Sequence, residues 1–240
     1  MCTLSWLRND GGYAVFFNRD ERRTRAPGLP PQEQLIDGVR VLAPIDPEGG
    51  GSWAAVNDRR IGLCILNQYD APRSNIPGQV SRGRLLLSLA ASTTQTGVWQ
   101  AVRSSGLAQY APFKLAVFEP ALPALLLSWD GARLTDEAIG QSGLLAASSS
   151  LVQREAEASR RTLFERTLHD GMTDTAAFEE LHRSHLPEKG ALSVCMHRDD
   201  AATVSFTRIV TDRASVMLGY VGGPPCEGGL ELELVAGSVG

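Results

Sequence analysis

The chain has 240 residues, of which 43% are hydrophobic, so it can bury a sizeable core as one large domain or two small ones. Its formal net charge of −4 argues against nucleic acid as the main partner. No apolar run reaches the roughly 18 residues that a membrane-spanning helix needs. The start of the chain also lacks the basic and then apolar segments of a secretory signal. These features predict a cytoplasmic protein without a membrane span, and they leave its oligomeric state open.

The cysteines are spread along the chain and show neither a C-x-x-C pair nor a close-set disulfide framework. They are Cys2, Cys64, Cys195 and Cys226. This spacing favours reduced thiols in a cytoplasm. Cys195-Met196-His197 forms a C-x-H pair, but no second ligand pair at zinc-site spacing lies near it in the sequence. The sequence therefore predicts no metal site.

The first twenty-one residues predict a β-hairpin. An apolar run over residues 1–7 is followed by an Asn-Asp-Gly-Gly turn at 9–12 and by a second apolar run over 13–17. Because the second strand returns to the point where the first begins, Cys2 is expected to lie close to residues 18–20. That end of the hairpin then combines a thiol with an arginine and a carboxylate.

Those groups are the parts of an activated nucleophile. If Met1 is removed, Cys2 carries both a thiol and a free α-amine, and the amine can take the thiol proton and return it to a leaving amine. Arg19 is expected to lower the pKa of the thiol by its charge, and Asp20 to hydrogen-bond the ammonium or fix the thiol rotamer. A small buried cysteine beside a surface salt bridge is the alternative interpretation of the same residues.

Polar and turn-rich segments separate the elements that follow. Residues 22–31 are polar and then proline-rich, which predicts a loop, and residues 39–43 predict a short strand. Strands over 52–56 and 61–67 form a second predicted hairpin, and the three glycines before it allow either a close backbone approach or a flexible turn. Asn67, at the end of its strand, is a candidate either for a turn cap or for a donor to an oxyanion.

The rest of the chain predicts two pairs of helices separated by strands. In chain order, the helices are expected over 81–91 and 96–105, strands over 113–119, 124–129, 133–135 and 144–148, helices over 153–169 and 175–185, and strands over 191–197, 202–209 and 215–220. The tail, 226–240, is acidic and weakly patterned. This order predicts an α+β fold, a four-layer αββα sandwich of two antiparallel sheets flanked by helices, in a single domain over residues 1–240.

Seven short motifs, in order over most of the chain, resemble the NRDE family, which is named for its Asn-Arg-Asp-Glu tetrapeptide. They are Met1-Cys2-Thr3-Leu4, Asn18-Arg19-Asp20-Glu21, Gly49-Gly50-Gly51-Ser52-Trp53, Leu66-Asn67, Ser81-Arg82-Gly83, Pro112-Phe113-Lys114-Leu115 and Ser193-Val194-Cys195-Met196-His197-Arg198. The eukaryotic members of the family are of the transport and Golgi organisation protein 2 type. The resemblance implies an N-terminal-nucleophile (Ntn) hydrolase fold.

It also implies a distant likeness to cysteine-type amidases, the penicillin V acylases and bile salt hydrolases. Cys2, Arg19 and Asp20 match the catalytic residues of those enzymes, and Asn67 falls where they place an oxyanion-hole asparagine. The resemblance does not place their later asparagine and final arginine, and the Ser148-Ser149-Ser150 run and Arg198 lie in plausible regions for them. The substrate-binding residues that we expect are Asn18, Trp53, Ser148, His197 and Arg198.

Two functions follow from the resemblance. The first is an N-terminal cysteine amidohydrolase that cleaves a small-molecule, non-peptide amide or thioester through a Cys2 acyl-enzyme and needs no cofactor. The second is a non-catalytic protein that binds and carries haem, lipid or acyl-CoA, in which Cys2, Cys195, Met196 and His197 offer ligands to iron or line the cleft. The C-x-x-C-H motif of covalent haem attachment is absent.

Overall fold

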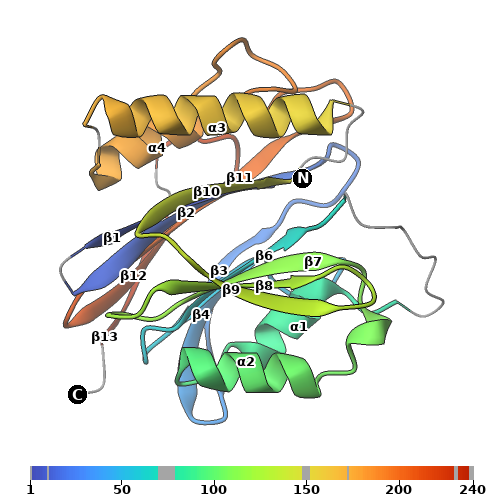
Figure 1. Ribbon diagram of the computed structural model, residues 1–240, viewed down its shortest axis with the longest axis vertical. Helices are drawn as coiled ribbons and strands as arrows, with labels where there is room; N and C mark the ends of the chain where they lie inside the picture. Colours follow the sequence, from blue (N-terminus) through green and yellow to red (C-terminus); the bar gives the residue numbers. More distant parts are fainter. Residues whose placement is uncertain are drawn as a thin grey trace.

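Two antiparallel sheets lie face to face, and helices cover their outer faces (Figure 1). The computed structural model describes residues 2–9, 11–69, 79–147, 152–171, 173–229 and 232–237. None of the helices in these ranges has the length and hydropathy needed to cross a membrane.

The first sheet, sheet A, has six strands and carries the N-terminal hairpin at its centre. Their order across the sheet is β10 (Ser142–Ala147), β1 (Cys2–Asn9), β2 (Gly12–Arg22), β11 (Ala201–Thr211), β12 (Ser215–Val221) and β13 (Leu232–Gly237). All neighbours pair antiparallel. The two central strands therefore come from opposite ends of the chain, since β2 pairs with β11 along most of its length.

The second sheet, sheet B, has seven strands that follow one another in chain order. They are β3 (Leu29–Ile36), β4 (Val39–Ile45), β5 (Ala54–Asn57), β6 (Gly62–Asn67), β7 (Phe113–Phe118), β8 (Ala124–Trp129) and β9 (Leu134–Ile139). Most of this sheet is thus built from local hairpins, and the crossover between β6 and β7 contains the first two helices.

Three layers of apolar side chains hold the four layers of backbone together. One core lies between the two sheets. A second joins sheet B to α1 (Arg82–Leu89) and α2 (Gln95–Ser104), and a short 3₁₀ turn, η1 (Leu107–Gln109), follows α2. A third joins sheet A to α3 (Gln153–His169) and α4 (Thr175–Arg183). The predicted αββα sandwich is confirmed.

Alternation along β2 decides which side chains reach which core. Tyr13, Val15 and Phe17 lie in the core between the sheets, whereas Ala14 and Phe16 pack beneath α3 and α4. Successive residues of β2 therefore face different layers. The same alternation places the polar side chains at the end of β2 on opposite faces of sheet A.

Two segments predicted as loop or weakly patterned tail are strands. β3 begins inside the predicted 22–31 loop, and its two prolines are accommodated because β3 is the edge strand of sheet B, where a missing backbone donor is tolerated. The register of β3 against β4 shifts between Leu29 and Gln32. At the other end of the chain, β13 forms within the 226–240 tail by pairing with β12.

The predicted strand over 191–197 is wrong. The backbone N–H groups of this segment bond to irregular neighbours in place of a strand ladder: that of Cys195 donates to the Ser184 carbonyl and that of His197 to the Gly190 carbonyl. The Ser193 hydroxyl donates to the carbonyl of Cys195 within the same segment. Such local side-chain bonds compete with strand pairing.

Candidate active site

Cys2 and Arg19 are a directly opposed pair across the N-terminal hairpin. In the antiparallel register Cys2 pairs with Arg19, Thr3 with Asn18 and Leu4 with Phe17. The predicted hairpin is confirmed, and it places the partly buried Cys2 side chain on the same face of sheet A as the arginine. Figure 1 marks with N the end of the sandwich at which β1 starts and β2 ends.

The guanidinium of Arg19 is held in place but keeps one donor free of protein partners. Its Cζ lies 4.4 Å from the centroid of the Trp53 ring, and its Nη2 lies 3.8 Å from carboxylate oxygens of both Glu21 and Asp46. Only 5% of Arg19 is exposed. Within the part of the chain that the structure describes, its buried Nη1 has no hydrogen-bond partner. A buried donor of this kind is available to a bound ligand.

Asp20 reaches Cys2 by its backbone, while its carboxylate is bound on the helix side of sheet A. The Asp20 backbone hydrogen-bonds the Cys2 sulfur. The Thr203 hydroxyl donates to Oδ1 over 2.7 Å, and Arg160 of α3 lies 3.4 Å from Oδ2. The Asp20 carboxylate is therefore anchored to the layer behind the site, and its contact with a mature α-amine at Cys2 stays a prediction.

The net shift in the pKa of the Cys2 thiol is opposite to the one expected from Arg19. Burial raises this pKa, and the negative charge of Asp20 adds to the rise. Arg19 does lower it, as the sequence suggested, but burial outweighs that charge. Cys2 is consequently a neutral thiol near pH 7, and its attack on a carbonyl requires a base to remove the proton.

Cys2 opens onto a cavity of about 760 Å³ between the ends of the two sheets. Five of the predicted site residues line it: Cys2, Arg19, Asp20, Trp53 and Asn67. Four arginines and four acidic residues contribute to the lining, namely Arg19, Arg22, Arg25, Arg82, Asp20, Glu21, Asp46 and Glu48. The larger apolar and aromatic residues that line it are Trp53, Ile65, Tyr69 and Val80. The cavity therefore suits a ligand with both charged and apolar parts.

Asn67 ends β6 at the same cavity and is already oriented by a neighbour. Its Nδ2 donates to the hydroxyl of Tyr69. An amide nitrogen has two hydrogens, so a second one remains for an acceptor in the cavity. The oxyanion role of Asn67 stays a prediction that this position supports.

The glycines before Trp53 permit a close backbone crossing. A Cβ atom at Gly51 would lie 2.2 Å from the backbone carbon of Gly83, at the start of α1. The Gly51 loop and the first turn of α1 can therefore pack backbone to backbone, which places Arg82 on the cavity wall. Of the two readings of these glycines, the structure supports the close approach.

Sequence reasoning did not assign a site role to Arg82, Tyr69, Arg160 or Thr203. Arg82 lies near Cys2 and Tyr69, and burial lowers the pKa of its guanidinium. Its Nη1 donates to the Pro112 carbonyl over 3.0 Å. Arg82 belongs to the Ser81-Arg82-Gly83 motif, so the sequence did contain a signal for it. Arg160 and Thr203 contact Asp20 from distant segments, and no local sequence pattern connects them to it.

The structure does not bring Asn18, His197 or Arg198 to this cavity. Asn18 is fully buried, and its Nδ2 donates to the carbonyls of His182 and Val194. His197 lines a different pocket, and Arg198 makes a surface ion pair of 2.6 Å with Asp200. Ser148 falls outside the described residues. Met196 and Cys195, named with His197 as candidate iron ligands, are also absent from the described lining of the cavity.

His182 is a core residue, not a catalytic base. It is fully buried, its Nε2 lies 2.8 Å from the Ser5 hydroxyl, and its ring stacks on Phe16. Burial lowers its pKa to about 3, and the charge of Arg160 adds to the effect. The imidazole is therefore neutral in the folded protein at all but strongly acidic pH.

This shift predicts a loss of stability in acid. The pKa of His182 is lower in the folded protein, at about 3, than in the unfolded chain, at about 6.5. As the pH falls below the unfolded value, the unfolded chain binds the proton first. The stabilisation is fully present above the unfolded-chain pKa. It is lost as the pH falls from there to the folded-state pKa, by up to about 1.4 kcal/mol per pH unit. Urea unfolding of the wild type and His182→Gln at several pH values measures this slope.

The His182→Gln variant should show a shallower acid dependence of its unfolding free energy than the wild type. His169→Gln, which changes an exposed histidine at the end of α3, should keep the wild-type slope. Equal slopes in all three proteins would contradict the assignment of the acid sensitivity to His182.

Comparisons with known proteins agree on the fold. No protein-family model and no curated protein matches the chain by sequence. An N-acylethanolamine-hydrolyzing acid amidase ortholog from Caenorhabditis elegans superposes with a TM-score of 0.64 at 12% identity, over 88% of this chain and 92% of its own. Penicillin V acylase from Agrobacterium tumefaciens gives 0.55 at 8% identity, over 93% and 84%.

The C2A mutant of the conjugated bile acid hydrolase from Clostridium perfringens gives a TM-score of 0.52 at 12% identity, over 99% of this chain and 96% of its own. At identities this low, the likeness speaks for the architecture of the chain and not for its reaction. This protein has the four-layer αββα fold of the Ntn-hydrolase type.

Proposed function

We propose that the protein is an N-terminal cysteine amidohydrolase that cleaves a non-peptide amide or thioester through an acyl-enzyme on Cys2. The observation that carries the proposal is the cross-strand pair of Cys2 and Arg19 at the wall of a cavity that also contains Asn67. The fold adds support, because structures named as an acid amidase, an acylase and a bile acid hydrolase share it. The bile acid hydrolase was itself studied as a C2A mutant, so it too has cysteine as its second residue.

The reaction begins after removal of Met1. The Cys2 α-amine takes the proton of the neutral thiol, and the sulfur attacks the substrate carbonyl. Asn67 and a backbone N–H stabilise the negative oxygen of the tetrahedral intermediate. The amine then protonates the leaving nitrogen, and a water hydrolyses the thioester to release the acid and regenerate the thiol. Because burial raises the pKa of the Cys2 thiol, the mechanism assigns the α-amine as the base that removes its proton.

The substrate class follows from the cavity wall. Arg19 offers a buried donor, and the four arginines with the acidic residues Glu21, Asp46 and Glu48 suit a small molecule with polar or charged groups beside the scissile bond. Trp53 and Ile65 provide an apolar surface that an apolar acyl group can contact. The tetrapeptide at 18–21 supports membership of the NRDE family as part of this proposal. A reducing compartment such as the cytoplasm would keep the Cys2 thiol free.

Intact-mass spectrometry tests the proposal directly. The purified protein should lack the mass of Met1. When it is mixed with a panel of N-acyl amides and acyl thioesters and quenched early, a hydrolysed substrate should leave one acyl group on the peptide that begins at Cys2. An active protein that retains Met1, or that acylates another residue, would exclude the amine-assisted route.

Arg19 is expected to assist both ionisation and binding. Because its charge lowers the pKa of the Cys2 thiol, Arg19→Met should move the pH profile of Cys2 alkylation to higher pH. The loss of the buried donor should also reduce kcat/KM by about tenfold to a hundredfold. Iodoacetamide labelling followed by peptide mapping measures the first effect. Arg22→Met, a change at an exposed residue of the same cavity wall, is the control and should leave the alkylation profile in place.

A further inference from the structure

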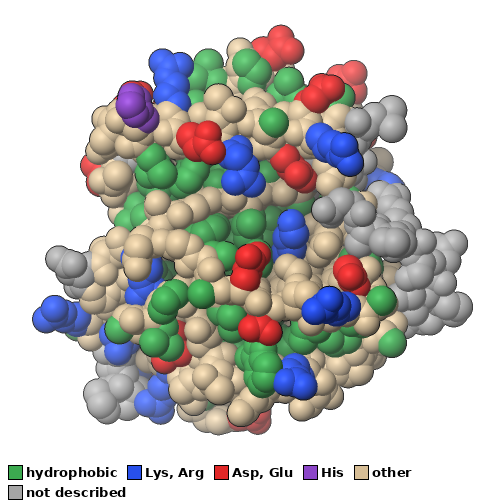
Figure 2. Space-filling model, viewed as in Figure 1, with side chains coloured by type: hydrophobic (Ala, Val, Ile, Leu, Met, Phe, Trp, Pro, Cys, Tyr) green, Lys and Arg blue, Asp and Glu red, His purple; other side chains and the backbone are tan. Residues whose placement is uncertain are grey.

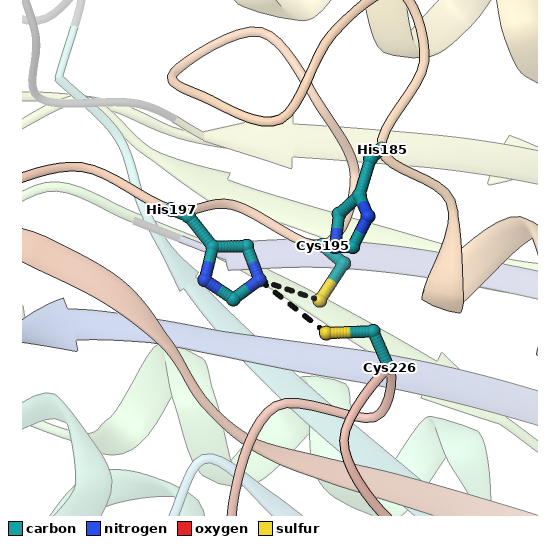
Figure 3. Close-up of side chains that lie close together, drawn as sticks. All are labelled: His185, Cys195, His197 and Cys226. Carbon is teal, nitrogen blue, oxygen red and sulfur yellow. Dashed lines mark hydrogen bonds between the residues drawn. The ribbon is translucent and has the colours of Figure 1, made fainter.

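Two histidines and two cysteines lie close together, and none of them is among the described residues that line the cavity at Cys2. His185, Cys195, His197 and Cys226 each offer one nitrogen or sulfur, and these ligand atoms all lie within 4.8 Å of one another. Figure 3 shows the two sulfurs directed at the ring of His197. The Cys195 sulfur lies 3.5 Å and the Cys226 sulfur 3.4 Å from the His197 Nε2.

We propose that these four side chains bind one zinc ion in a tetrahedral Cys₂His₂ site. Zinc–sulfur bonds of about 2.3 Å and zinc–nitrogen bonds of about 2.0 Å require sulfur–nitrogen edges of roughly 3.5 Å in a tetrahedron. The two observed sulfur–nitrogen distances of 3.5 and 3.4 Å match that edge. All the ligand atoms lie within 4.8 Å of one another, so no pair exceeds that edge by much more than an ångström.

Hydrogen bonding alone accounts poorly for this arrangement. A neutral imidazole nitrogen accepts or donates one hydrogen bond, yet two sulfurs lie at the same nitrogen of His197. The Nε2 of His185 is buried and has no hydrogen-bond partner among the described residues, although its ring lies edge-on to His197 with centroids 5.1 Å apart. A shared cation satisfies the unpaired nitrogen and both sulfurs at once. Two thiolates with two imidazoles are a donor set that favours zinc.

The site would brace a region with little regular structure. His185 follows the end of α4, Cys195 and His197 belong to the irregular segment 191–197, and Cys226 lies in the turn after β12. The ligands thus come from three separate segments, which explains why the spacing of Cys195 and His197 alone predicted no metal site. Small irregular regions without a large core of their own are commonly stabilised by a structural metal.

The segment that contains Cys195 and His197 is also connected to Asp20 through Thr203. Between the ligands Cys195 and His197, the Met196 N–H donates a hydrogen bond to the Thr203 Oγ1 over 2.8 Å. The Thr203 hydroxyl in turn donates to Asp20 over 2.7 Å. A metal that fixes residues 195–197 would therefore also fix Thr203 and the Asp20 carboxylate. This contribution is structural, and the proposal holds whether or not Cys2 proves catalytic.

Metal analysis of the purified, full-length protein tests the site. Protein made in zinc-supplemented medium and dialysed against metal-free buffer should retain about one zinc per chain by mass spectrometry of the metal. Replacement by cobalt should give sulfur-to-cobalt charge-transfer absorption in the near ultraviolet and the intense visible bands of tetrahedral cobalt. Cys226→Ser and His185→Ala should lose the bound metal, while Cys2→Ser and His169→Ala should keep it.

Several outcomes would overturn the proposal. Wild-type protein without stoichiometric zinc that also fails to bind added zinc or cobalt would exclude the site, and this readout needs no variant to fold. A Cys195–Cys226 disulfide in protein purified under reducing conditions would assign the cysteines a different role. Retention of the full cobalt spectrum in Cys226→Ser would show that the metal is held elsewhere. If the site is real, a chelator should lower the Tm of the wild type by several degrees and that of Cys226→Ser by much less.

Discussion

We expect Cys2→Ala to lose turnover of any substrate that the wild type hydrolyses, by on the order of a thousandfold or more. The change removes the only atom that the proposed mechanism uses to form the acyl-enzyme. Alanine at position 2 still permits removal of Met1, so the α-amine and the cavity stay in place. Cys2→Ser should fall between the two proteins, because a hydroxyl keeps the geometry but is a weaker nucleophile. Steady-state kcat/KM for the three proteins measures the effect.

Cys64→Ala is the matched control, since it removes a second thiol from the core cluster against which Cys2 packs. Cys64 lies on β6, is fully buried in the core between the sheets, and has a pKa raised by burial. Its loss should cost about 1–2 kcal/mol of stability through the cavity left behind and should leave kcat/KM within a few-fold of the wild type. If Cys2→Ala hydrolyses substrate as fast as Cys64→Ala, the nucleophile is not Cys2.

The sequence was most informative where neighbouring residues decide the structure. The hairpin that opposes Cys2 and Arg19 follows from a turn sequence between two apolar runs, and α3 was predicted with its observed bounds because its pattern is long. The four layers followed from the order of the elements. The edge strand β3 was missed because its prolines suggest a loop, and only its position at the edge of sheet B makes them compatible with a strand.

What the sequence could not supply is contact between distant segments. Arg160 lies 140 residues after Asp20, and Thr203 lies 183 residues after it, yet both bind its carboxylate. The pKa of Cys2 was expected to fall because the charge of Arg19 is visible in the sequence, whereas the burial that raises it is not. His197 and Asn18 were assigned to substrate by their positions in motifs, and the fold places them in other surroundings.

The distribution of charged side chains over the surface could also be seen only in the structure. The net charge of −4 says nothing about its distribution. On the face shown in Figure 2, positive and negative side chains are interspersed, without a broad basic area among the described residues. The arginines around Cys2 are likewise matched by carboxylates. Both observations fit a small polar ligand better than a polyanion.

Arg160→Met is expected to lower the free energy of unfolding by about 3–5 kcal/mol, the largest effect on stability that we predict. The Arg160 side chain is fully buried, and its Nη1 donates to the Thr3 hydroxyl over 2.8 Å and lies 3.4 Å from Asp20. Its Nη2 donates to the Ala191 carbonyl over 3.5 Å. Methionine fills much of the same volume but leaves the Asp20 charge buried without its cationic partner. Urea unfolding followed by circular dichroism measures the change.

Arg161→Met provides the control, because Arg161 is the next residue of the same helix and is exposed. It should change the unfolding free energy by no more than about 0.5 kcal/mol. Adding Asp20→Asn to Arg160→Met removes the unpaired charge, so the double variant should recover part of the lost stability. If Arg160→Met is as stable as Arg161→Met, the buried pair contributes nothing to folding. If the double variant is no more stable than Arg160→Met, the cost of that change lies in packing and not in the carboxylate that has lost its cation.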